Sequence, residues 1–154
     1  MMEASKTNLV KQYEPDVECS RWIERRPDEI WDYLADVSNE PQWRDIMIEA
    51  HWVSDPPYRI GSTGLHVVKG VGDWPWKVTE WDEHRSVSWI VTDGRFEGSH
   101  AGYRVLPENA GSLVTLHAHF KRSTFMRFVV PIVKLRMRRQ FAAELSKLKA
   151  IMET

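Results

Sequence analysis

The chain has 154 residues, of which 42% are hydrophobic, so it is long enough for one domain with a substantial buried core. Its formal net charge at pH 7 is -1, from 21 basic and 22 acidic residues. Proteins that bind nucleic acid through phosphate contacts need a strongly basic face, so this balance argues against a nucleic-acid partner. A single cysteine, Cys19, cannot form an internal disulfide, and its apolar-alternating surroundings favour a core residue over a nucleophile.

No apolar run reaches the roughly 18 residues that a membrane-spanning helix needs, and residues 1–13 lack the apolar stretch of a signal peptide. We therefore expect a cytoplasmic protein. Residues 1–13 are polar and lack periodicity, which indicates a flexible tail, and residues 14–154 are expected to form a single domain. The sequence does not specify an oligomeric state.

A strand, a helical insert and a second strand are expected first. Residues 17–24 predict the first strand. A helix then begins at Pro27, where a missing N–H costs nothing, and Asp28 and Glu29 suit the positive end of the helix dipole. Residues 46–53 predict the second strand, which two prolines end.

Five more strands and a long helix follow. The strands are expected at hairpin spacing over residues 61–69, 74–81, 86–92, 95–106 and 113–121. Between about residue 123 and residue 152, apolar residues recur at steps of three and four, which predicts a C-terminal helix. Pro131 interrupts this pattern, so the helix either starts near it or kinks there.

Strand pairing predicts which side chains share the inner face of the sheet. Side chains alternate with period two, so turns over residues 82–85 and 107–112 bring apolar positions of neighbouring strands opposite one another. The residues expected on this face include Trp76, Val78, Glu80, Trp89, Tyr103 and Leu116.

The connection at Asp93-Gly94 is typical of a two-residue hairpin turn. Strict pairing from this turn would give His100 and its strand the opposite facing from Tyr103. An extra residue must therefore be absorbed, and a bulge is expected within residues 98–102. The face on which His100 lies stays open.

Four segments in this order resemble a known family: PDEIWDYLADVSNEPQW at 27–43, the Ile60-Gly61 pair, KVTEWDEHRSVSW at 77–89 and FAAELSKLKAIME at 141–153. The chain resembles the START/Bet v 1-like (SRPBCC) superfamily, in particular its polyketide cyclase/dehydrase and lipid-transport branch. The resemblance implies an α+β helix-grip fold, in which a curved seven-stranded antiparallel sheet wraps around the C-terminal helix, with two short helices between strands one and two. It also implies a cavity for a hydrophobic ligand, no cofactor and no shared catalytic residues, so the fold alone assigns no reaction.

The ligand is expected to contact inward-facing residues of the sheet, one residue of the helical insert and one of the last helix. The chain has eight tryptophans, and large flat rings suit a planar apolar ligand, although they also fill small cores. Trp43 is expected at the mouth of the cavity. The expected ligand-binding residues are Trp43, Trp76, Val78, Glu80, Trp89, Tyr103, Leu116 and Phe141.

Glu80 and Tyr103 are the candidates for chemistry. A carboxyl in an apolar cavity has a raised pKa and can act as a general acid or base, whereas the alternative for Glu80 is a rim residue paired with an arginine. Tyr103 can donate a hydrogen bond to a ligand oxygen or be an ordinary core tyrosine. Both remain weak candidates for catalysis.

Two other patterns could indicate a metal site and a membrane-binding helix. His117 and His119 lie two apart, and His100 would lie across from His119. The apolar neighbours of His117 and His119 are expected on the inner face, which directs both histidines outward, so no metal site is expected. Residues 125–139 are apolar and then basic, which is typical of a membrane-binding helix. A helix that packs on the sheet explains the same pattern, so we do not expect membrane contact. An intermediate alternative is that the end of this segment forms a flexible gate for the ligand, hinged at Pro131.

The sequence therefore predicts a carrier or sensor that binds a small hydrophobic or amphipathic ligand. The alternative is a polyketide cyclase, aromatase or dehydratase that moves a proton on a bound carbonyl compound, since proximity alone contributes much of such catalysis. A cavity of about 300 Å³ or more would support both, and an interior filled by tryptophans would oppose both.

Overall fold

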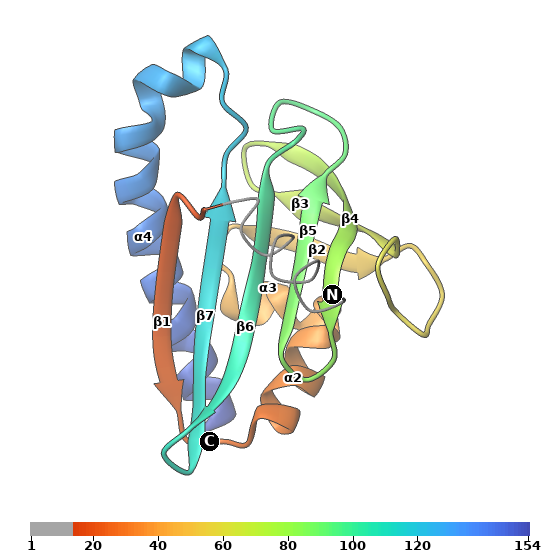
Figure 1. The fold of residues 1–154 in the computed structure, drawn as a ribbon, viewed down its shortest axis with the longest axis vertical. Helices are drawn as coiled ribbons and strands as arrows, with labels where there is room; N and C mark the ends of the chain where they lie inside the picture. Colours follow the sequence, from red (N-terminus) through yellow and green to blue (C-terminus); the bar gives the residue numbers. More distant parts are fainter. Residues whose placement is uncertain (1–13) are drawn as a thin grey trace, which may run out of the picture.

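A seven-stranded antiparallel sheet curls around one long C-terminal helix in the computed structural model, which describes residues 14–154 (Figure 1). The expected tail at residues 1–13 lies outside the described residues. Neighbouring strands follow the order β1-β7-β6-β5-β4-β3-β2. This architecture confirms the predicted α+β helix-grip fold.

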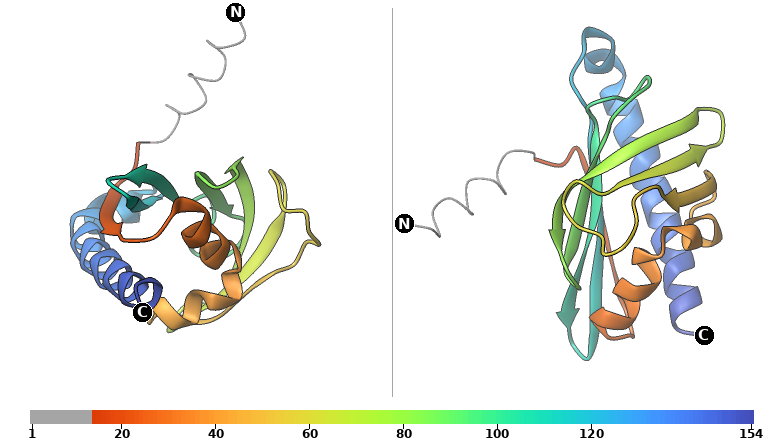
Figure 2. Two further views of the ribbon diagram at one scale, coloured as in Figure 1. Left: turned by 90° about the horizontal axis from the view of Figure 1, so that it is seen from below. Right: turned by 90° about the vertical axis from the view of Figure 1, so that its right-hand side faces the viewer.

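The elements follow the predicted order with shifted ends. The strands are β1 (Val17–Ile23), β2 (Met47–Trp52), β3 (Thr63–Val68), β4 (Gly72–Asp82), β5 (Ser86–Val91), β6 (His100–Glu108) and β7 (Gly111–His119). The helices are α2 (Pro27–Ala35), the short 3-10 turn η1 (Val37–Asn39), α3 (Glu40–Trp43) and α4 (Thr124–Met152). Seen from below, α2 and α3 lie across the opening that the curled sheet and α4 leave (Figure 2). The insert therefore closes one end of the fold.

Helix α2 is held in place by one apolar stripe. Pro27 occupies its first turn, and Ile30, Trp31 and Leu34 are buried. The Trp31 ring meets the rings of Trp81 and Tyr103 edge-on, at centroid distances of 5.2 and 5.8 Å. Trp31 thus anchors the insert to the inner face of the sheet.

A bulge in β4 overturns the expected facing of Glu80. Trp76 and Val78 pair with Val91 and Trp89 as predicted, but the register shifts between Val78 and Glu80. The extra residue reverses the alternation, so Glu80 lies exposed on the outer face and Trp81 packs against the core instead. There Glu80 accepts hydrogen bonds from the hydroxyls of two serines of β5, at 3.1 and 3.4 Å.

The connection between β5 and β6 is longer than predicted. Strand β6 begins at His100 rather than at residue 95. The Gly98 N–H donates to the Val91 carbonyl and the Val91 N–H donates to the Ser99 carbonyl, each at 2.9 Å, so two residues oppose Val91 and a bulge lies within the predicted residues 98–102. Gly98 adopts a left-handed φ of +86° in this bulge. Strict pairing with Ile90 places His100 on the outer face.

Helix α4 starts before Pro131 and continues through it. The Ser123 hydroxyl caps the helix by accepting a hydrogen bond from the Met126 N–H, at 3.2 Å. Pro131 lies inside the helix, where the lost N–H and the ring disturb the preceding turn, and the first turns of α4 run at an angle to the rest (Figure 1). Among residues 14–154, no helix has the length and hydropathy to cross a membrane.

The close approach of β3 to the Trp76 ring is open to a direct test. We expect Gly64→Ala to lower the free energy of unfolding by about 2 kcal/mol, because a Cβ at this buried position would overlap that ring. Urea unfolding measures the change. Trp76→Phe makes room, so the double variant should lose less than the sum of the two single losses. Strict additivity would contradict the proposed contact.

Candidate functional site

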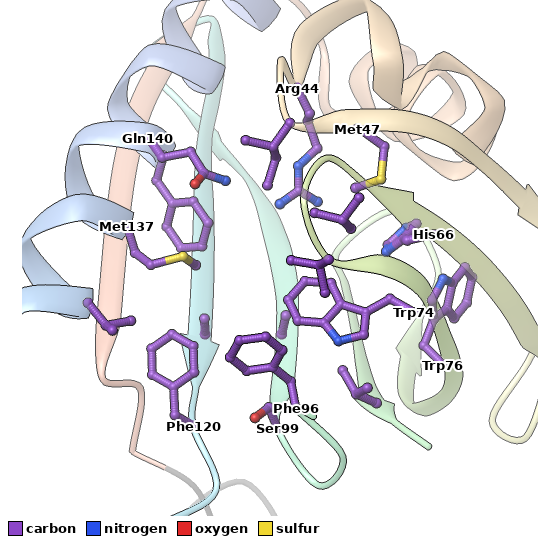
Figure 3. Close-up of a pocket in the computed structure, with 18 of the residues that line it drawn as sticks. Arg44, Met47, His66, Trp74, Trp76, Phe96, Ser99, Phe120, Met137 and Gln140 are labelled. Atoms are coloured by element: carbon purple, nitrogen blue, oxygen red, sulfur yellow. The ribbon is translucent and has the colours of Figure 1, made fainter. Parts of the chain in front are cut away.

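A cavity of about 360 Å³ lies between the sheet and the middle of α4 (Figure 3). Its walls come from β2 through β7, the loop between β5 and β6, and α4. Most of its surface is apolar, and its aromatic side chains are Trp74, Trp76, Trp89, Phe96, Phe120 and Phe141. The interior is therefore not filled by its tryptophans, and the space is within the size range of small-molecule sites, roughly 300–1,000 Å³.

Only some of the predicted contact residues lie at this cavity. Trp76, Trp89 and Phe141 line it. Val78 is buried in the core and does not line it, and Glu80 lies on the outer face of the sheet.

The other three predicted residues lie deeper. Trp43, Tyr103 and Leu116 surround a separate space of about 10 Å³, too small for an organic ligand. Trp43 is only 1% exposed, so its expected place at the mouth is wrong. Burial raises the pKa of Tyr103, and Glu40 raises it further, so this hydroxyl stays protonated.

Four ionisable side chains meet at the inner end of the cavity, and we call them the buried ionic cluster: Glu40, Arg44, His66 and Glu144. Glu40 Oε2 lies 2.8 Å from His66 Nε2 and 3.8 Å from Arg44 Nη1. Arg44 Nε lies 3.4 Å from Glu144 Oε2. The cluster therefore joins α3 and the residue that follows it to β3 and α4.

The charges of the cluster stabilise one another. Burial opposes ionisation of Glu40, but the contact with His66 and the charge of Arg44 outweigh it and hold the pKa of Glu40 below its usual value. Burial also opposes the charge of Arg44, but Glu144 and Glu40 outweigh it and raise the pKa of Arg44. Because Glu40 is ionised, the proton between it and His66 resides on the imidazole Nε2.

Two indole N–H groups at the cavity lack a hydrogen-bond partner among the described residues. They belong to Trp74 and Trp76. Arg44, His66, Trp74 and Trp76 all line the cavity, and Figure 3 shows them converging on it. Unpartnered buried donors are costly, and a ligand that carries hydrogen-bond acceptors would satisfy them.

Sequence reasoning missed the cluster, although two signals existed. In β3 (TGLHVV), His66 has the same parity as Gly64 and Val68, so it faces inward with them. Glu144 lies three residues after Phe141, on the apolar side of α4 that faces the sheet. A charged residue on an otherwise apolar side of a helix indicates a buried partner.

The histidines of β7 face away from the cavity. His117 packs against Gly102 on the outer face, where a Cβ at the glycine would lie 2.9 Å from its ring. Burial and the nearby Arg104 lower the pKa of His117 to about 4. His119 Nδ1 lies 2.9 Å from the Glu14 carbonyl oxygen. No group of three or more metal-ligating side chains is present within residues 14–154.

The family comparison agrees with this architecture. A family model described as "Polyketide cyclase / dehydrase and lipid transport" matches residues 14–153. The chain belongs to this family. No curated protein matches it. The description of the family and the apolar cavity seen here agree, and together they support ligand binding in this cavity.

Solved structures share the fold at low sequence identity. TTHA0849 from Thermus thermophilus is 18% identical, with a TM-score of 0.71, over 87% of this chain and 94% of that one. XoxI from Bacillus cereus is 11% identical, with a TM-score of 0.71, over 88% and 94%. The major latex-like protein 151 of Panax ginseng is 12% identical, with a TM-score of 0.64, over 88% and 95%. At such low sequence identity, the likeness shows a shared fold alone.

The ionised state of Glu40 predicts a pH-dependent stability. We expect Glu40→Gln to lower the free energy of unfolding at pH 7 by about 3 kcal/mol, because it leaves the buried Arg44 guanidinium with one carboxylate fewer. The pKa of Glu40 is lower in the folded state, so its contribution is present above the unfolded value of about 4.3 and is lost as the pH falls through the folded value.

Urea unfolding of both proteins at pH 7 and at about pH 3 measures this. The difference between them should shrink in acid. Glu83→Gln, at an exposed carboxylate in the turn between β4 and β5, is the matched control and should change little at either pH. Equal stability of wild type and Glu40→Gln at pH 7 would contradict the role given to the cluster.

Proposed function

We propose that the protein binds a small apolar or amphipathic molecule in the cavity and acts as a carrier or sensor. The observation that carries this proposal is the open, aromatic-walled space of about 360 Å³, which the unpartnered indole N–H groups of Trp74 and Trp76 border. The lipid-transport part of the family description supports it.

The ligand should have an acidic or acceptor-rich end. The charged side chains that line the cavity are basic, namely Arg44, Lys69 and Arg136, and no aspartate or glutamate is among the described residues that line it. Glu40 and Glu144 lie behind Arg44 and pair with it there. A neutral or anionic group that accepts hydrogen bonds therefore finds donors in the cavity, while a cation would meet like charge.

A second candidate, proton transfer on a bound carbonyl compound, rests on His66. Its ring lines the cavity, and its Nε2 lies 2.8 Å from the ionised Glu40. An imidazole oriented by a carboxylate is a common general acid or base. The two residues first considered for this role do not serve it, since Glu80 is on the outer face and Tyr103 does not line the cavity.

Blocking the cavity should abolish binding of an aromatic probe. Ala118 lines the cavity and is buried, so Ala118→Phe would fill part of the space. We expect anilinonaphthalene sulfonate to bind the wild type with increased fluorescence and to bind Ala118→Phe at least about tenfold more weakly. Ala150→Phe, at an exposed position of α4, is the control and should bind as the wild type does. Unchanged affinity in Ala118→Phe would place the probe elsewhere and contradict the proposal.

The acidic end can be tested with a second, neutral probe. Phenylnaphthylamine has the same rings as anilinonaphthalene sulfonate but no sulfonate. The double variant Lys69→Gln/Arg136→Gln removes two of the basic side chains of the cavity. It should weaken the sulfonate by about three- to tenfold and leave the neutral probe nearly unchanged, as titrations of both probes would measure. Equal losses for the two probes would contradict a charge preference.

Native mass spectrometry of the purified protein would identify a bound compound directly. With that compound in hand, His66→Gln separates the two candidate functions. Loss of its conversion with retained binding would favour proton transfer, and a compound that wild type binds and leaves unchanged would favour a carrier or sensor.

A further inference from the structure

Helix α4 carries an apolar stripe on its outer face, away from the sheet. Its four members, which we call the α4 stripe, are between 52% and 80% exposed: Phe125, Phe128, Ile132 and Leu135. Steps of three and four place them on one side of the helix. On the opposite side Val130 is buried and Val133 packs against the core. Single exposed apolar residues are ordinary, but four large side chains in one row indicate an interaction site.

The stripe lies in the most basic part of the chain. Residues 121–140 contain seven lysines and arginines and no acidic residue. This segment therefore carries a formal charge of +7 against -8 in the rest of the chain, since the whole chain carries -1. Arg122 pairs with Asp16 at 2.6 Å, and Lys134 lies 4.0 Å from the same carboxylate.

Five basic side chains of this segment make no ion pair with any residue in the described range: Lys121, Arg127, Arg136, Arg138 and Arg139. All five are exposed. Helical spacing places Arg127 and Arg138 along one edge of the α4 stripe and Arg136 along the other edge. Arg139 lies in line with the stripe itself, beyond Leu135.

We propose that the α4 stripe docks on an anionic lipid surface. An apolar row bordered by lysine and arginine fits the boundary between head groups and acyl chains, where the apolar side chains are buried and the basic ones meet lipid phosphates. Charge complementarity selects this occupant. A second copy of the chain would bring two faces of the same positive charge together in a two-fold dimer, which repulsion opposes.

The docked helix also borders the cavity. Val133 and Met137 line the cavity from the same turns that carry Ile132 and Leu135 outward. Docking would therefore bring the cavity close to the lipid surface. The proposal goes beyond ligand binding and does not depend on it, since none of the four stripe residues lines the cavity and, of the charges that border the stripe, only Arg136 does.

Sedimentation with lipid vesicles tests this proposal on the full chain. We expect the wild type to bind phosphatidylcholine vesicles that contain phosphatidylglycerol at least about tenfold more strongly than pure phosphatidylcholine, and to dissociate at about 0.5 M NaCl. Ile132→Asp should weaken this binding about tenfold or more. Ile60→Asp is the matched control, because Ile60 is 64% exposed against 65% for Ile132 and lies outside the stripe. Arg127→Glu/Arg138→Glu should weaken binding as well, and Arg85→Glu, on the β4–β5 turn, should not.

Near-UV circular dichroism and light scattering accompany each variant. If Ile132→Asp does not fold, Phe128→Ser serves the same purpose, because Phe128 is the most exposed member of the stripe. Failure of the wild type to bind anionic vesicles would overturn the proposal, and so would equal vesicle binding by Ile132→Asp and Ile60→Asp. A dimer that Ile132→Asp dissociates, without vesicle binding by the wild type, would overturn it in favour of a second copy.

Discussion

The ion pair between Arg44 and Glu144 is the constraint on which the shape of the interior depends. It connects the end of the helical insert to α4, and Glu40 and His66 complete its charges from α3 and β3. On one side of it, Leu145 and Leu148 are fully buried and the fold is packed. On the other side lies the cavity. Charged groups cannot be covered by apolar side chains without a partner, so the cluster marks where dense packing ends.

The tryptophans differ in how their indole N–H groups are satisfied. The indole N–H of Trp52 donates to the Ala35 carbonyl and that of Trp22 to the Glu108 carbonyl, at 2.9 and 2.8 Å. The N–H groups of Trp74 and Trp76, at the cavity, have no such partner among the described residues. Rings that only filled a core would gain from satisfying their donors, as Trp52 does. The buried Trp43 N–H also lacks a partner within residues 14–154 although Trp43 does not line the cavity, so an unsatisfied N–H points to a ligand only where it borders the cavity, as at Trp74 and Trp76.

Local patterns in the sequence predicted the elements, but not the site. Alternation of period two and apolar steps of three and four are visible within about ten residues, and they located the strands and α4. The bulge beside Val78 leaves no such local pattern, so Glu80 was placed on the wrong face. The cluster depends on three segments far apart in the chain, around residues 40, 66 and 144, so only the tertiary fold brings its members together. The resemblance to a family predicted that a cavity exists, but it could not say which polar groups line it.

Helix α4 combines two kinds of support along its length. Its second half is held by apolar packing at Leu145 and Leu148, and these side chains need nothing outside the chain. Around residues 132–137 the cavity lies on its inner side, at Val133 and Met137, and the exposed stripe on its outer side, at Ile132 and Leu135, so both faces there hold apolar surface that the fold leaves uncovered. Burial of apolar surface is the main favourable term in folding, so these turns are a less stable part of the helix. A ligand would cover one of these faces and a lipid surface the other, and each would then stabilise the same turns. The two partners proposed for the protein would thus be coupled through the order of one helix segment, without a contact between them.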